Sequence, residues 1–112
     1  MNIPPAALLG AAILSEVMAT TALKASDGFT RLGPSLLAGL GYCISFYLLA
    51  QVMKSIPTGV VYAVWSGLGI VLISAVGWAV YGEKLDTAAV VGMAMIVAGV
   101  GVIQLFSKTA GH

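Results

Sequence analysis

The sequence predicts an all-α membrane protein with four transmembrane helices. Of its 112 residues, 60% are hydrophobic and only 8% are charged, and the mean hydropathy is +1.05. Soluble domains contain about 25% charged residues, so this chain lacks the polar surface that contact with water requires. Four apolar segments reach the roughly 20 residues that a helix needs to cross a bilayer. In lipid, such segments satisfy their backbone groups as helices, whereas a membrane barrel would show short alternating strands.

The four segments follow one another with short connections that hold most of the charges. Glu16 alone interrupts the first segment, the second and third are uncharged, and Asp86 is suited to cap the fourth helix. Pro57 disfavours continuation of the second helix into the third. No basic region precedes the first apolar run, so we interpret it as a retained helix rather than a cleaved signal peptide. Residues 1–112 are expected to form one transmembrane domain, with helices at about 4–23, 32–53, 58–81 and 87–107.

The basic residues are few and isolated, which bears on partners and on orientation. No basic cluster exists, so nucleic-acid binding is not expected, and the surroundings of the chain are membrane lipid. Lysine and arginine in short loops normally set the orientation of a membrane protein. Here two fall on one side and three on the other, which predicts insertion in both orientations and an antiparallel pair; a single orientation is the alternative. One side carries Lys54 and Lys108, and the other carries Lys24, Arg31 and Lys84.

Glu16 is the acidic residue inside a predicted span. It lies 12 residues after Pro4, roughly 18 Å along the helix and therefore near mid-bilayer. An ionised acid at this depth costs about 2.5 kcal/mol or more, and no basic residue is predicted at a comparable depth. Loss of water favours the protonated acid, whereas an arriving cation favours the carboxylate. We therefore predict a site that exchanges protons for cations; a structural acid hydrogen-bonded between helices is the alternative.

Residues at helical spacing from Glu16 complete the predicted site on the first helix. Ala12, Ile13 and Thr20 share its face; small alanines leave room beside the carboxyl group, although they also favour helix packing. Thr20 is placed to donate a hydrogen bond to the acid. No cofactor or metal site is predicted, because Cys43 stands alone and no phosphate-loop motif is present.

Aromatic side chains on the second and third helices are predicted to bind the cation. Tyr62 and Trp65 share one face of the third helix, and Tyr42 and Ser45 share a face of the second. Aromatic faces attract organic cations by about 2 kcal/mol when water is excluded. An interfacial aromatic belt is the alternative, but Trp65 lies about two turns inside its helix.

Glycines in the last two helices suggest movement and assembly. Gly67 and Gly69 weaken the middle of the third helix and permit a bend. Gly92 and Gly99 lie seven residues apart on one face of the fourth helix. Because small residues allow close helix packing in membranes, we predict that this face forms a contact between subunits.

These motifs together resemble the small multidrug resistance family of bacterial inner-membrane transporters along nearly the whole chain. The resemblance implies a multi-pass protein of the bacterial inner membrane and an antiparallel homodimer that exchanges protons for lipophilic, often aromatic, cationic drugs. It also implies that Glu16 of both subunits forms the shared site with the aromatic residues, that the fourth helix dimerises, and that the glycine pair bends the third. The matching residues are Glu16-Val17, Thr20-Thr21, Lys24, Gly28 to Arg31, Tyr42, Ser45-Phe46, Ile56 to Gly59, Tyr62 to Gly67 and Gly82 to Asp86.

Two other functions stay open from the sequence. Guanidinium exporters of the same family usually carry tryptophan at the position of Ala19 and threonine at that of Ser66, so the chain resembles the multidrug branch instead. A membrane assembly subunit without transport activity would tolerate replacement of Glu16 and Trp65. An enzyme is not expected, because the spans contain no histidine paired with a nucleophile.

Overall fold

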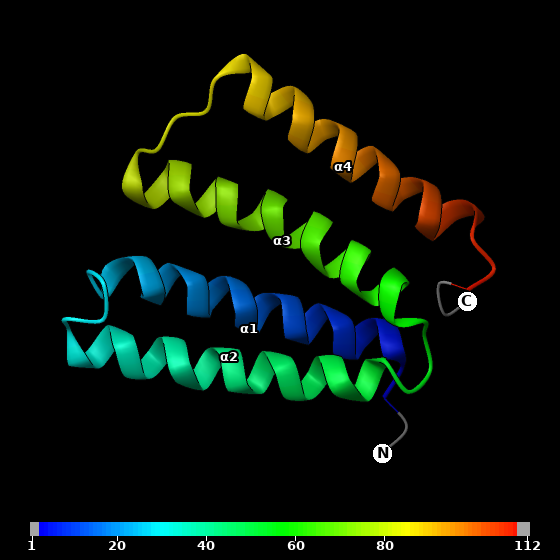
Figure 1. The fold of residues 1–112 in the computed structure, drawn as a ribbon, viewed down its shortest axis with the longest axis horizontal. Helices are drawn as coiled ribbons and strands as arrows, with labels where there is room; N and C mark the ends of the chain where they lie inside the picture. Colours follow the sequence, from blue (N-terminus) through cyan, green and yellow to red (C-terminus); the bar gives the residue numbers. More distant parts are fainter. Residues whose placement is uncertain (1–2, 110–112) are drawn as a thin grey trace.

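The computed structural model describes residues 3–109, and this part of the chain folds into four α-helices without β-strands (Figure 1). Each helix is long and apolar enough to cross a membrane, which confirms the all-α prediction of four transmembrane helices. The first helix runs two residues past its predicted end, and the other bounds differ by at most one residue. The helices are α1 (Pro5–Ala25), α2 (Leu32–Val52), α3 (Thr58–Tyr81) and α4 (Thr87–Phe106).

Local sequence signals explain where the helices begin and end. Pro5 occupies the first turn of α1, where a missing N–H is tolerated. Ser26 extends the polar contacts at the end of α1, since its hydroxyl donates to the carbonyl of Leu23 and accepts from the N–H of Phe29. Gly82 ends α3 in the left-handed conformation, with φ of 66°. The predicted cap of α4 is confirmed, because the Asp86 carboxylate accepts from the Ala89 N–H at 2.9 Å.

The helices lie side by side in the order α2, α1, α3, α4, and α1 therefore has a neighbour on each side (Figure 1). The α1–α2 and α3–α4 connections lie at one end of the helices, and the α2–α3 connection lies at the opposite end. The molecule is a slab with principal extents of 43 × 38 × 18 Å. A single chain of this shape has two broad faces and little interior.

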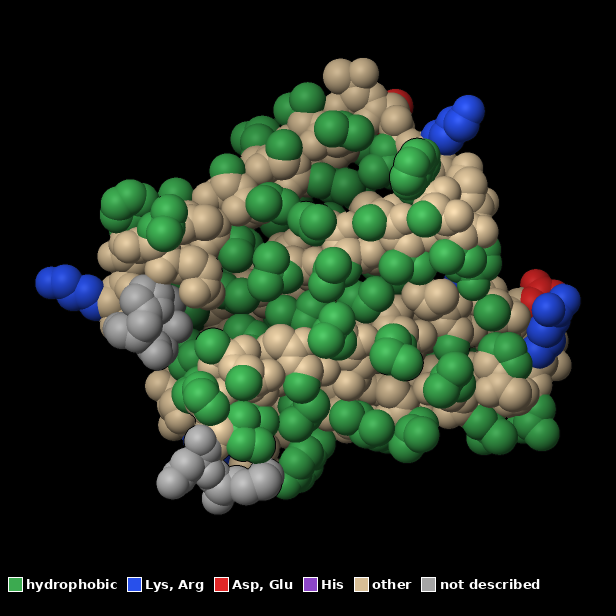
Figure 2. All heavy atoms as spheres, turned by 180° about the vertical axis from the view of Figure 1, so that it is seen from behind, with side chains coloured by type: hydrophobic (Ala, Val, Ile, Leu, Met, Phe, Trp, Pro, Cys, Tyr) green, Lys and Arg blue, Asp and Glu red, His purple; other side chains and the backbone are tan. Residues whose placement is uncertain are grey.

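The hydrophobic core is small, and most large apolar side chains face outward. Figure 2 shows hydrophobic side chains spread over one whole face, with the charged side chains confined to its margins. This distribution suits a lipid environment, because only the helix ends present charges to water. α4 has one buried residue, Val100. The buried apolar cluster comprises Leu9, Ala12, Ile13, Val17, Leu49, Val52, Ile56, Val61, Val64 and Val100.

Candidate functional site

Glu16 lies on the side of α1 that faces α3, where its side chain is half-buried. The α3 backbone passes close to it at Gly69, and a Cβ atom placed on that glycine would lie 3.3 Å from Glu16 Oε2. A larger residue at this position would press on the carboxylate. Gly69 therefore makes room for the acid in this conformation.

A hydrogen-bonded chain connects Glu16 to α2. The Thr20 hydroxyl donates to Glu16 Oε1 at 2.7 Å, and it also lies 2.7 Å from the Tyr42 hydroxyl. A threonine hydroxyl carries one proton. Because Thr20 gives that proton to the carboxylate, Tyr42 must be the donor to Thr20. The predicted contact between Thr20 and Glu16 is therefore present, and Tyr42 is connected to the acid through it.

The Glu16 carboxyl group opens into a cavity of about 270 Å³ between α1 and α3. Apart from Glu16 and one serine hydroxyl, the side chains around it are apolar or aromatic. An organic cation would lose its water there but would find a carboxylate and an aromatic ring. The cavity is lined by Glu16, Trp65, Ser66, Gly69, Ile70 and Ile73.

Trp65 also lines a second, apolar cavity of about 400 Å³ between α2 and α3. The Tyr62 ring meets the Trp65 ring edge-on, with centroids 5.4 Å apart and ring planes at 70°. Trp65 Nε1 is buried and has no hydrogen-bond partner within residues 3–109. Buried donors are nearly always paired, so this N–H is available to a group outside that part of the chain. The second cavity is lined by Phe46, Leu49, Ala50, Met53, Val61, Tyr62 and Trp65.

Three predicted site residues line neither of these two cavities and take no part in the hydrogen-bonded chain from Glu16 to Tyr42. Ser45 is fully buried, and its hydroxyl donates to the carbonyl of Ala12 at 2.8 Å, which joins α2 to α1. Ala12 itself is buried in the same contact. Ile13 belongs to the core and lines a different cavity. These residues support the helix that carries Glu16 rather than the wall around its carboxyl group.

The predicted hinge and assembly glycines differ in their surroundings. α3 is one continuous helix through Gly67 and Gly69, so their role in a bend stays a prediction. Gly67 packs against Val100 of α4, because an added Cβ would overlap that side chain. Gly92 and Gly99 have open space where a Cβ would stand, so their face of α4 is uncovered in the single chain.

No basic side chain forms an ion pair with Glu16 in the described range. The ion pair in the described range joins Lys24, near the C-terminal end of α1, to Glu83 of the α3–α4 connection. Both side chains are about half-exposed. The absence of a resident cation near the carboxyl group agrees with the positions of the basic residues in the sequence. The Glu16 carboxyl group therefore has no counter-ion among residues 3–109.

Sequence reasoning missed Ile70 and Ile73 in the cavity wall. Both could have been found by helical periodicity, since Ile70 lies four residues after Ser66 and Ile73 lies eight after Trp65. The contact of Lys24 with Glu83 has no such signal, because it joins residues 59 positions apart.

Comparison with known proteins identifies the family of the chain. Residues 6–96 match the family model described as Small Multidrug Resistance protein. The quaternary ammonium compound-resistance protein QacE of Escherichia coli is 56% identical over 101 residues, which cover 90% of this chain and 92% of QacE. The multidrug transporter EmrE of Escherichia coli K12 is 53% identical over 108 residues, or 96% and 98% of the two chains.

A third relative, the quaternary ammonium compound-resistance protein QacF of Klebsiella aerogenes, is 53% identical over 104 residues, or 93% of this chain and 94% of QacF. The family match covers most of the chain, and these three relatives align over almost their full lengths. This chain belongs to the small multidrug resistance family.

Proposed function

We propose that this chain is a secondary active transporter of the bacterial inner membrane that exchanges protons for lipophilic aromatic cations such as quaternary ammonium compounds. The observation that carries the proposal is the position of Glu16, an acid without a counter-ion among residues 3–109, in an apolar cavity walled by Trp65. The names of QacE and EmrE, which refer to quaternary ammonium compounds and to multiple drugs, support the substrate class.

The two cavities that share Trp65 suit a cation with a bulky apolar body. The positive centre would lie near Glu16, where the Coulomb attraction becomes strong once a second copy covers the open face and excludes water. The apolar part would extend past Trp65 into the cavity lined by Tyr62, where ring faces and edges are available. A small guanidinium ion would leave this second cavity unused, which favours drug-sized substrates.

Competition for one carboxylate is sufficient to couple the two movements. An inward-facing site releases its proton and takes up the cation between Glu16 and the aromatic rings. After the site changes the side to which it opens, an external proton displaces the cation, and the return step carries the proton inward. Both ligands need the same negative charge, so the mechanism requires no second binding site.

The working unit in this proposal is an antiparallel homodimer of single-domain chains. One slab cannot surround a ligand, and a second copy would cover the open face and supply a second Glu16. The unpaired Nε1 of Trp65 supports the view that another group completes the site. Gly92 and Gly99 of α4 would lie in the dimer contact, and Gly67 and Gly69 would permit α3 to bend between the two open states.

The central test is replacement of Glu16 by glutamine, which keeps the shape but cannot ionise. In proteoliposomes with an imposed pH gradient, the wild type should accumulate tetraphenylphosphonium, and Glu16→Gln should abolish this uptake. Asp27→Asn is the matched control, because Asp27 lies in the α1–α2 turn with positive φ, which asparagine tolerates. Gradient-driven uptake by Glu16→Gln at the wild-type rate would refute the exchange mechanism.

A further inference from the structure

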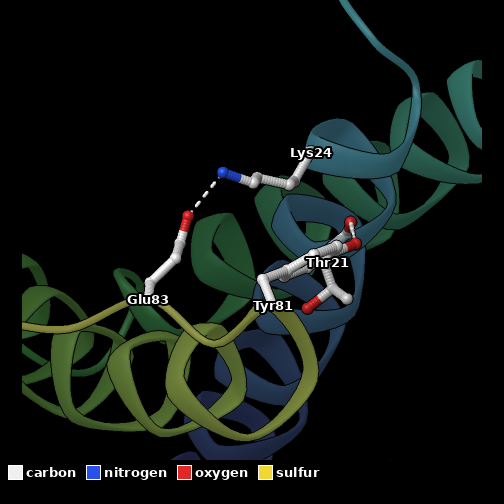
Figure 3. A network of polar contacts seen from close by, with 4 residues as sticks. All are labelled: Thr21, Lys24, Tyr81 and Glu83. Carbon is white, nitrogen blue, oxygen red and sulfur yellow. Dashed lines mark hydrogen bonds and ion pairs between the residues drawn. The ribbon is translucent and has the colours of Figure 1, made fainter.

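A group of polar contacts ties the C-terminal end of α1 to the α3–α4 turn (Figure 3). Lys24 Nζ lies 2.5 Å from Glu83 Oε2 and 5.5 Å from the centre of the Tyr81 ring. The Tyr81 hydroxyl donates to the backbone carbonyl of Thr21 at 3.0 Å. We call these four residues, Thr21, Lys24, Tyr81 and Glu83, the latch.

Two glycines place Glu83 where Lys24 can reach it. Gly82 adopts φ of 66°, which turns the chain back at the end of α3. The Glu83 N–H then donates to the carbonyl of Gly77 at 3.1 Å. The Glu83 side chain lies over Gly77, where an added Cβ would overlap Oε1. The position of the acid is therefore built into the backbone of the turn and into the missing side chain of Gly77.

The latch lies next to a small cavity that adjoins the Glu16 cavity. This small cavity has a volume of about 120 Å³, and its wall includes Thr20, which donates to Glu16. Ile73 lines both this cavity and the one that holds the Glu16 carboxyl group. The remaining wall of the small cavity is formed by Thr21, Lys24, Val76, Gly77, Tyr81 and Glu83.

We propose that the latch is a gate that closes this end of the Glu16 cavity and must open when the site becomes accessible from the same end. The proposal rests on the transport function proposed above. The end of α1 is held to the α3–α4 turn by these contacts, so separation of α1 from α3 at this end requires that they break. Trp65 and Tyr62, in the walls of the two larger cavities, take no part in the latch contacts.

The chemistry of the latch suits a contact that forms and breaks in every cycle. Both members of the ion pair are about half-exposed, at 53% and 47%. Exposed ion pairs are weak and are screened by salt, so water replaces them at little cost. A strong, buried pair would hold the gate in one state. Because the closed gate is only slightly favoured, loss of one partner should shift the balance several-fold toward the open state.

The test measures access to Ile73 rather than transport. Cys43→Ser removes the native cysteine, and Ile73→Cys places a thiol in the wall shared by the two cavities. We expect Glu83→Gln and Lys24→Met each to raise the rate of reaction with a water-soluble maleimide about three-fold or more. The charge exchange of Lys24→Glu with Glu83→Lys should return the rate toward that of the parent, and Lys84→Gln is the matched control for loss of a charge in the same turn.

Tetraphenylphosphonium binding within two-fold of that of the parent, which carries Cys43→Ser and Ile73→Cys, would show that each latch variant is folded. Equal labelling rates in the parent and both single variants, or a charge exchange that labels as fast as the singles, would overturn the gate. Failure of the wild type to take up cations under a pH gradient would instead refute the proposed function, and the labelling result would still decide whether the latch controls access.

Discussion

The Thr20 hydroxyl connects Glu16 to Tyr42 by two hydrogen bonds. It donates one to Glu16, and it therefore accepts the other from the Tyr42 hydroxyl. The hydrogen bond holds Glu16 Oε1 on the side of Thr20, while Oε2 lies beside Gly69 of α3. Thr20 thus fixes the position of the carboxyl group, although the ligand itself need not contact the threonine.

Replacement of Thr20 by valine should weaken cation binding. The change removes the hydroxyl while keeping the branched shape, so the carboxylate loses a hydrogen bond of about 1.5 kcal/mol or more. Without that bond the Glu16 side chain is no longer held in one position beside the cavity, and the affinity for tetraphenylphosphonium at a fixed pH should fall about three-fold or more. Thr20→Ser keeps the hydroxyl and should retain the wild-type affinity in the same equilibrium measurement. Equal affinities for the valine variant and the wild type would mean that the hydrogen bond does not position Glu16.

A residue on the same helix face as Glu16 and an aromatic residue deep in an apolar helix could be predicted for the site, whereas the contacts that depend on how particular helices pack could not. Thr20 follows from its spacing of four from Glu16, and Trp65 from its depth in an apolar helix. Ser45 also shares a face with Tyr42, but the structure places its hydroxyl on the Ala12 carbonyl. Periodicity gives the face of a helix; it does not give the rotation of that face toward a particular neighbour.

At the scale of helices, α1 and α2 approach each other closely at Gly41. A Cβ atom on Gly41 would lie 2.7 Å from the Ala19 Cβ and 3.1 Å from the Ser15 carbonyl oxygen. The two backbones can approach this closely because both residues are small. The existence and bounds of the helices followed from apolar length and capping residues, but the choice of partner did not. α2 contains Gly33, Gly39 and Gly41, and the sequence alone does not show which of them meets a neighbouring helix.

Replacement of Gly41 by alanine should therefore destabilise the protein. The added methyl group meets the backbone and Cβ of α1, and overpacking of this kind costs about 1–3 kcal/mol. Gly39→Ala is the matched control on the same helix, because a Cβ there meets nothing within 4 Å and alanine favours a helix. Unfolding of the two variants in detergent micelles should separate them by this amount. Equal midpoints would show that the close approach at Gly41 adapts without strain.

The whole molecule is too thin to enclose a cation by itself. Its shortest extent is 18 Å, and α4 buries only Val100 among its residues. The sequence indicated a pair through its small charge bias rather than through any recognisable interface. Three basic residues lie at the end with the α1–α2 and α3–α4 turns, and two lie toward the other end. The proposed antiparallel dimer depends on this near-balance, because both orientations of one sequence must reach the membrane.

A variant with its basic residues concentrated on one side of the membrane should therefore lose transport. Co-expression of two variants with opposite charge bias should restore it. The first set, Lys54→Gln with Lys108→Gln, leaves three basic residues at the end with the α1–α2 and α3–α4 turns and none at the other end, which favours one orientation. The second set, Arg31→Gln and Lys84→Gln with Ser55→Lys, leaves one basic residue at the first end and three at the other, which favours the reverse orientation. Each set alone should show a one-sided signal from a terminal reporter and lose cation export, whereas co-expression should recover export. Export by either set alone, with its reporter wholly on one side, would mean that the active unit is parallel, because no chain of opposite orientation would then be present.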